Sequence, residues 1–176
     1  MTESINEKSF SGVRTMEFNS TSVATVTRTA DTNAYGAGDV IGAATGSTAA
    51  LTFAEIGEIG SHIVVLDADL RIDINAVPSG MTSFKLHLYN VTPPSALGDN
   101  AVFNLPAGDR ASYLGYIDLG TPVDQGDTLF VQTAGTGSKQ IKMGATTSLF
   151  GYLVTTGAYT PSSGDVFTVR LNVKSV

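Results

Sequence analysis

Hydrophobic and polar residues alternate along several stretches of the chain, most clearly between Ser61 and Ile74. Even-numbered positions from Val64 to Ile74 are apolar, and odd-numbered positions from Asp67 to Asp73 are charged. Period two over this length predicts one long β-strand, or two strands joined by a bulge, with one face in the core and one face in water. The same alternation predicts half-buried strands at 84–89 and 167–173.

Shorter apolar segments add weaker strand candidates, separated by turn-rich stretches of Gly, Pro, Asn, Asp and Ser. The candidates are 13–18, 23–28, 40–41, 49–53, 113–119, 128–133, 139–143 and 149–155. Helical periodicity is limited to one short turn within 107–112. Strands at this spacing predict an all-β antiparallel sandwich of about eight to ten strands. Its core is expected to contain Val64, Leu66, Leu70, Ile72, Phe84, Leu86, Leu88, Val169 and Leu171.

A Gly-Asp pair precedes apolar residues three times, at 38–41, 126–129 and 164–167. Glycine adopts positive φ without strain and aspartate bonds nearby backbone, so the pair is expected to introduce each strand. A calcium loop is the alternative interpretation, although these carboxylates are far apart in sequence.

The amino-acid composition excludes several classes of function. The chain has 176 residues, no cysteine, 15% charged residues and a net charge of -6. Thiol and redox chemistry are excluded, and without a basic cluster we expect no nucleic-acid partner. The first ten residues carry Glu3, Glu7 and Lys8 where a secretory signal requires an apolar stretch, and no run approaches the ~20 apolar residues of a membrane helix. We therefore expect a soluble protein made in the cytoplasm, with no membrane partner.

The chain is predicted to form a single domain, residues 13–176, behind a polar N-terminal arm, residues 1–12. Ile5 and Phe10 are the main apolar residues of the arm. Two such anchors do not offset the entropy of ordering the segment on its own domain, so we expect the arm to be mobile in the free protein and to matter for binding, for example by ordering on a neighbouring subunit.

Candidate chemistry is sparse. His62 shares the parity of an apolar strand face and His87 that of a polar one, so their predicted positions are in the core and at the surface. Asp67, Asp69 and Asp73 share one strand face, and residues two apart on such a face lie about 7 Å from each other. This spacing suits a cation site or a glycosidase pair, but a solvated face with Arg71 interleaved is the simpler interpretation. Residues 135–139 (GTGSK) lack the spacing of a phosphate loop and are expected to form a hairpin turn. We predict no catalytic residue, cofactor or metal, and hence no enzyme.

Apolar residues on the outward faces of strands need a cover, because a sandwich has one core. Subunit contact is the expected cover, and the arm or a loop is the alternative. The predicted interface comprises Ile5, Phe10, Ile63, Val65, Phe150, Tyr152 and Val154.

Four short groups of residues between about 28 and 133 stand out as strand starts and turns. They are 34–42 (AYGAGDVIG), 86–90 (LHLYN) followed by Pro93 and Pro94, 99–101 (DNA) with Phe103, and 109–110 (DR) with 113–116 (YLGY). Together they resemble the small jelly-roll decoration, or cement, proteins of tailed bacteriophage capsids.

The resemblance implies a jelly roll that forms a homo-oligomer, often a trimer, and binds the outer face of the major capsid protein lattice, where it stabilises subunit contacts. Its location would be the exterior of the virion. The alternatives are a phage adsorption module, such as a tail-fibre tip that binds host sugars, and a carbohydrate-binding or hydrolytic sandwich domain. The absence of Trp weighs against the sugar-binding alternatives.

Overall fold

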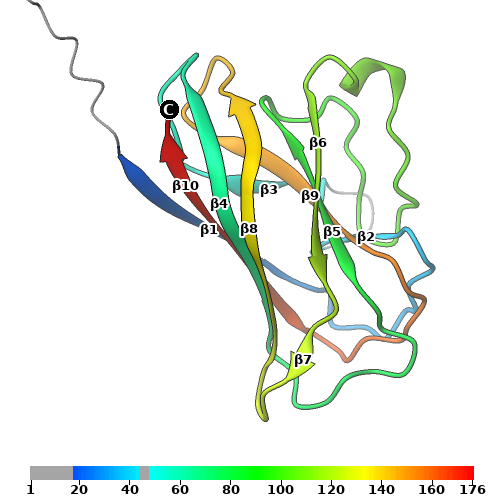
Figure 1. Cartoon of the computed structure of the whole chain (residues 1–176). Helices are drawn as coiled ribbons and strands as arrows, with labels where there is room; N and C mark the ends of the chain where they lie inside the picture. The colour runs from blue at the N-terminus through cyan, green and yellow to red at the C-terminus, as the bar shows by residue number, and fades with distance from the viewer. Residues whose placement is uncertain (1–17, 44–47) are drawn as a thin grey trace, which may run out of the picture.

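The chain folds into two antiparallel β-sheets that face each other (Figure 1). The computed structural model describes residues 18–43 and 48–176, and for 134–138 the backbone alone. The predicted arm, including Ile5 and Phe10, and most of the candidate strand 13–18 lie outside the described residues. The described strands are β1 (Asn19–Thr27), β2 (Val40–Ile41), β3 (Leu51–Phe53), β4 (His62–Ile72), β5 (Phe84–Tyr89), β6 (Tyr113–Gly120), β7 (Val123–Asp124), β8 (Leu129–Lys142), β9 (Leu149–Thr155) and β10 (Val166–Ser175), with one 3₁₀ turn, η1 (Ala107–Asp109).

The strand order is that of a jelly roll. One sheet runs β1-β10-β4-β8-β7 and the other β2-β9-β5-β6, with β3 also paired to β9, and every pair is antiparallel. Most connections cross from one sheet to the other, as in the two Greek keys of a jelly roll, and only β2–β3, β5–β6 and β7–β8 follow each other within one sheet. The predicted all-β antiparallel sandwich is confirmed.

The core lies between the sheets and is made by the inward side chains of both. Leu70 and Val169 of the first sheet and Leu86 of the second are fully buried. Phe84 meets Phe167 edge to face across the sandwich, with ring centroids 6.2 Å apart. Of the predicted core, the structure confirms Leu70, Ile72, Phe84, Leu86, Leu88, Val169 and Leu171.

A β-bulge in β4 overturns the rest of that prediction. Val65 pairs with Val173 of β10 and Asp67 pairs with Asn172, so Leu66 has no cross-strand partner on β10. An extra residue reverses which parity faces inward. Val64 is consequently half-buried and Leu66 is 37% exposed, whereas Ile63 and Val65 are fully buried in the core.

The predicted hairpin turn at residues 135–139 is also wrong, because β8 continues through it as one strand. Asp67 of β4 pairs with Ala134 and Val65 pairs with Lys139, so β8 has four residues where β4 has one. The glycine-rich segment therefore forms a large bulge in β8 opposite the β4 bulge. It cannot turn back as a hairpin, because β8 pairs with β4 on both sides of it.

The Gly-Asp pairs precede strands as expected. Before β2 and β10 they make the same type of hydrogen bond. Gly38 and Gly164 have φ of 93° and 74°. The carboxylates accept from the backbone N–H three residues earlier, Asp39 from Gly36 (2.5 Å) and Asp165 from Ser162 (2.9 Å). Each aspartate therefore closes the turn before its strand rather than bonding the backbone that follows.

Candidate functional site

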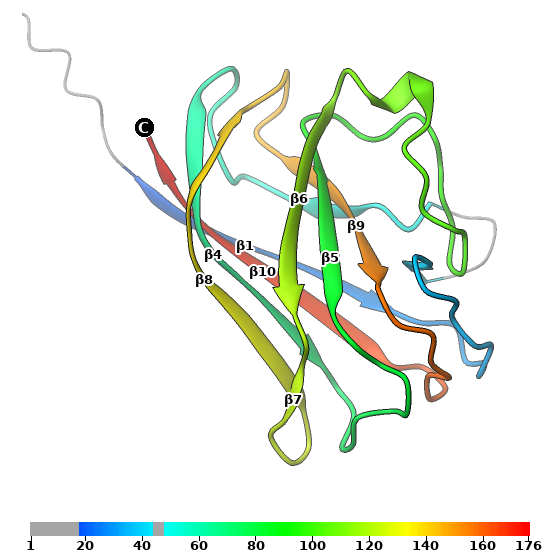
Figure 2. The same cartoon turned by 45° about the vertical axis from the view of Figure 1, so that its right-hand side comes forward.

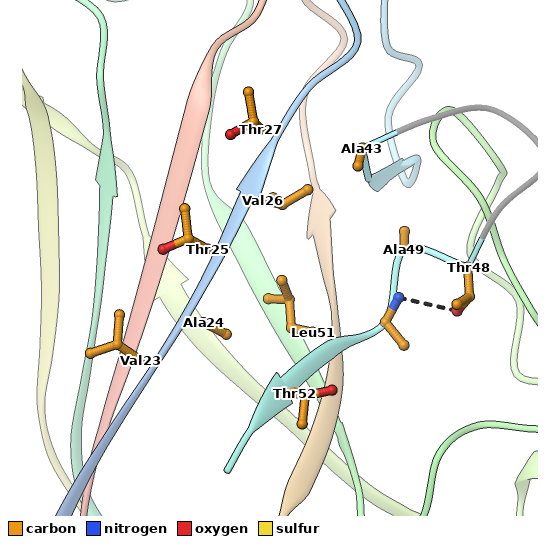
Figure 3. Close-up of a pocket in the computed structure, with 11 residues that line it drawn as sticks. Val23, Ala24, Thr25, Val26, Thr27, Ala43, Thr48, Ala49, Leu51 and Thr52 are labelled. Atoms are coloured by element: carbon orange, nitrogen blue, oxygen red, sulfur yellow. Dashed lines mark hydrogen bonds between the residues drawn. The ribbon is translucent and has the colours of Figure 1, made fainter.

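A groove runs along the side of the sandwich where the edge of β1 faces β3. It has a volume of about 490 Å³ and is lined by residues 23–27, Ala43 and residues 48–52. Figure 3 shows Ala24 and Val26 pointing from β1 toward Leu51 of β3. The lining contains only Val, Ala, Thr and Leu, so it offers no titratable group for catalysis and no charge for an ionic ligand.

The backbone of β1 gives this groove its hydrogen-bonding capacity. At the ends of the β1–β10 pair, the Arg28 N–H donates to the Asp165 carbonyl and the Ser175 N–H to the Phe18 carbonyl, both at 2.9 Å. The register between them is continuous. Because antiparallel ladders alternate, even-numbered residues of β1 bond β10, and Thr21, Val23, Thr25 and Thr27 direct their N–H and C=O to the free edge.

A second candidate is a cluster of rings on the outer face of the second sheet. The His87 ring lies 3.8 Å from that of Phe103 between centroids and 5.5 Å from that of Tyr116. His87 Nδ1 shares a hydrogen bond with the Tyr113 hydroxyl (2.9 Å), and Lys85 Nζ lies 4.8 Å from the centre of the Tyr116 ring. Burial, with a smaller contribution from the Lys85 charge, lowers the pKa of His87 to about 4, so the ring is neutral at pH 7.

This ring cluster borders a hollow of about 370 Å³ between β5, β9 and the loop at 37–38. Tyr116 is 49% exposed and packs against two residues that line the hollow, Lys85 and His87. The predicted positions of the two histidines are therefore reversed: His87 is buried and His62 is exposed. His62 precedes the β4 bulge, and His87 is covered by the Phe103 ring of the following loop and by the rings of Tyr113 and Tyr116 in β6.

That loop, residues 90–112, covers the outer face of the second sheet (Figure 2). Tyr152 donates its hydroxyl hydrogen to the Ser95 carbonyl (2.6 Å) and is fully buried, and Val154 and the half-buried Phe150 belong to the same cluster. Subunit contact was the expected cover, but a loop of the same chain, the alternative, buries Tyr152 and Val154 and partly covers Phe150.

The same correction applies to Ile63 and Val65, which the predicted interface placed on an outward face. The β4 bulge turns both into the core between the sheets. The two remaining predicted interface residues, Ile5 and Phe10, lie outside the described residues.

A buried polar network ties three loops together at the end of the sandwich near β2. The Tyr35 hydroxyl donates to Asp99 Oδ1 (2.5 Å), which also accepts from the Gly42 N–H (2.8 Å). Arg28 donates to the Tyr35 oxygen and lies 3.5 Å from Asp99 Oδ2 and 3.1 Å from Asp31 Oδ1. Burial raises the pKa of Tyr35, with the Asp99 carboxylate adding to the effect. The network is charge-paired, and all of its side chains except that of Asp31 are buried, which indicates a structural role.

The carboxylates of β4 do not form the uniformly solvated face that the sequence predicts. Asp69 is fully buried and its Oδ2 accepts from Arg170 Nε of β10 at 2.6 Å. Asp67 accepts from the Asn172 amide at 2.5 Å, whereas Asp73 is exposed. Within residues 18–43 and 48–176, no group of three or more His, Asp or Glu residues is arranged to hold a metal ion.

Reasoning from the sequence missed the β1 edge and the ring cluster. The edge has a signal in the sequence, because 21–27 (TSVATVT) is β-branched and uncharged, without Pro or Gly. The ring cluster has none, because it depends on where the 90–112 loop packs.

Comparison of the sequence with protein-family models finds no matching family, and comparison with curated proteins finds no matching relative. In the part of the chain that the structure describes, no helix is long and apolar enough to cross a membrane.

Proposed function

We propose that the protein is a virion structural component, a decoration protein that binds the outer surface of a phage head as a homo-oligomer and stabilises contacts between major capsid protein subunits. In this role the protein performs no catalysis and uses no cofactor. The sequence resemblance names this class, and the arrangement of the residues that carry the resemblance supports it.

The supporting observation is that these residues, far apart in sequence, come together. The Val40 N–H donates to the Ala101 carbonyl (2.9 Å), and the Asn100 N–H donates back to the Val40 carbonyl (3.0 Å). The Phe103 N–H reaches the Gly38 carbonyl (2.8 Å). The resembling stretches 34–42 and 99–103 thus form one hydrogen-bonded unit over the second sheet. If the resemblance were a coincidence among unrelated turns, there would be no reason for these stretches to be hydrogen-bonded to each other.

The physical character of the fold also suits a passive particle component. The loop over the second sheet is held by buried hydrogen bonds, such as that between Tyr152 and Ser95, rather than by contacts that a small ligand completes. Many copies on an icosahedral lattice convert modest contacts into tight retention when each oligomer engages several subunits.

The test is reconstitution on heads that lack the protein. Purified chain is mixed with such heads, and the bound fraction is measured by co-sedimentation before heads are challenged with heat or chelator. Saturable binding with increased survival of the heads supports the proposal. An unrelated jelly-roll protein of similar size and acidity is the control for non-specific adsorption. Absence of binding at saturating protein contradicts the proposal.

The ring cluster favours one alternative, a module that binds host polysaccharide during adsorption. Exposed Tyr116 beside a hollow provides an aromatic surface on which a sugar ring can pack. This alternative predicts that Tyr116→Ala abolishes polysaccharide binding, whereas Val123→Ala, exposed on the other sheet, does not. Retention on polysaccharide without binding to heads would replace the decoration proposal with this one.

A further inference from the structure

The free edge of β1 is chemically unusual for an exposed strand. Its nine residues include no charged residue, proline or glycine. Exposed edges are normally protected by charge, proline, bulges or short length, because their unpaired N–H and C=O groups recruit other strands. The pairing of β1 with β10 is regular over all nine residues, so no bulge twists this edge away.

The other edges of the described sheets are short or closed. β7 is two residues long and ends in Asp124, and β2 and β3 have two and three residues. Where β6 and β8 meet, side chains close the gap: Lys139 Nζ donates to the Leu114 carbonyl (2.9 Å) and Thr133 Oγ1 to the Asp118 carbonyl (2.8 Å). Among the strands that the structure describes, β1 therefore provides the long, regular edge that no other described strand pairs with, at the outside of its sheet (Figures 1 and 2).

The hydrogen bonds available on β1 match those of a second, antiparallel β1. The residues that direct backbone groups outward are odd-numbered, and antiparallel pairing of two identical strands over their full length places odd residues opposite odd ones. Val23 then lies opposite Val23 of the other copy, and Thr21 lies opposite Thr25. This register provides about ten backbone hydrogen bonds over nine residues.

Side chains agree with the same register. Thr21, Val23 and Thr25 are all exposed on the outer face, and Val23 is 49% exposed. Cross-strand pairs of Val with Val and of Thr with Thr are favourable, and no like charges oppose each other even though each copy carries a net charge of -6.

We propose that two copies of this chain pair through their β1 edges, antiparallel and centred on Val23, so that the β1 sheet continues from one copy into the other. The inference does not depend on the proposed decoration role. A two-fold contact uses the whole edge of both copies, so it builds dimers and even-numbered assemblies and not a closed trimer.

Cysteine crosslinking tests both the pairing and its register, because the natural chain has no cysteine. Opposed residues in a hydrogen-bonded pair have Cα atoms about 5.5 Å apart, within the range of a disulfide. Val23→Cys should therefore crosslink under mild oxidation to twice the 18.2 kDa chain mass. Thr21→Cys alone is the matched control, since its own counterpart lies roughly 14 Å along the strand. An equal mixture of Thr21→Cys and Thr25→Cys should crosslink again.

Amide exchange of the unaltered protein provides an independent measurement. The N–H groups of Thr21, Val23 and Thr25 should exchange on the order of 100-fold more slowly at concentrations where sedimentation shows a dimer than in dilute monomer. The N–H groups of Ser22 and Ala24, which bond β10, serve as internal controls because they are protected in both.

Several outcomes would overturn the pairing: no crosslink at Val23, equal crosslinking of all single variants, or a trimer without a dimer. Fast exchange of the odd amides at every concentration would show that the edge stays free. Protection that persists in dilute monomer would show that another segment of the same chain occupies it, and protection that appears only with capsid protein would assign the edge to that partner.

Discussion

Acidification from pH 7 to pH 5 should destabilise the fold through His87, and His87→Gln should remove that effect. The His87 ring is buried against Phe103 and faces Lys85, Tyr113 and Tyr116, with no carboxylate among the groups described around it. Burial, assisted by the Lys85 charge, lowers the pKa of His87 to about 4. Protonation in the folded protein is therefore disfavoured, whereas the unfolded chain accepts the proton near the ordinary value of about 6.5.

The magnitude follows from the two pKa values. Between pH 6.5 and 4 the unfolded state binds more protons than the folded state, so the free energy of unfolding falls as the pH falls. For a pKa of about 4 in the folded state and about 6.5 in the unfolded state, the loss from pH 7 to pH 5 is about 2 kcal/mol. Comparison with His87→Gln separates this contribution from that of every other group that titrates between pH 7 and pH 5.

The assay is urea unfolding at pH 7, 6 and 5, followed by circular dichroism of the strands. Gln keeps a polar group near the Tyr113 hydroxyl but cannot titrate, so the difference between wild type and His87→Gln should shrink by about 2 kcal/mol across the window. His62→Gln, altered at an exposed site, is the control and should keep the wild-type pH dependence. A wild-type minus His87→Gln difference that does not change with pH would refute the reasoning.

Three substitutions test the packing. Leu86→Ala removes a fully buried side chain from the centre of the core and should cost about 2 to 5 kcal/mol in urea unfolding; a cost below 1 kcal/mol would contradict its placement. Asp69→Asn weakens a buried charge-assisted hydrogen bond and should cost about 1 to 3 kcal/mol, against a few tenths for exposed Asp73→Asn, and equal costs would restore the solvated-face interpretation. Gly80→Ala should lower the melting temperature more than Gly60→Ala. Both residues have positive φ, but an added Cβ overlaps a backbone carbonyl only at Gly80. Equal effects would show that the positive φ, and not the overlap, causes the destabilisation.

Where a strand is regular, the alternation of apolar and polar residues was enough to predict both the strand and which of its residues are buried. The β10 alternation from Phe167 to Val173 is reproduced residue by residue, because a continuous ladder with β1 and β4 keeps one parity inside. Residues 149–155 were predicted with the bounds that β9 has. Composition and the spacing of the turns were likewise enough to predict an all-β sandwich, because helical periodicity is limited to one short segment.

Tertiary structure decided which residues of β4 are inside. The even-numbered residues from Val64 to Ile72 are all apolar, yet the odd-numbered residues are buried before the bulge at Leu66 and the even-numbered ones after it. The bulge is set by the fit of β4 between β8 and β10, and a period-two pattern contains no information about the register of neighbouring strands.

The candidate sites depended on the fold in the same way. Tyr152 and Val154 have the apolar outward pattern of an interface, but the 90–112 loop buries them, and His87 has the parity of a wet face but is covered by rings. The sequence shows that β1 is an uncharged segment rich in β-branched residues. It does not show that this strand lies at the edge of its sheet. Sequence patterns encode which face of a strand is apolar, while the cover over that face and the partner beside the strand are long-range contacts that only the folded chain fixes.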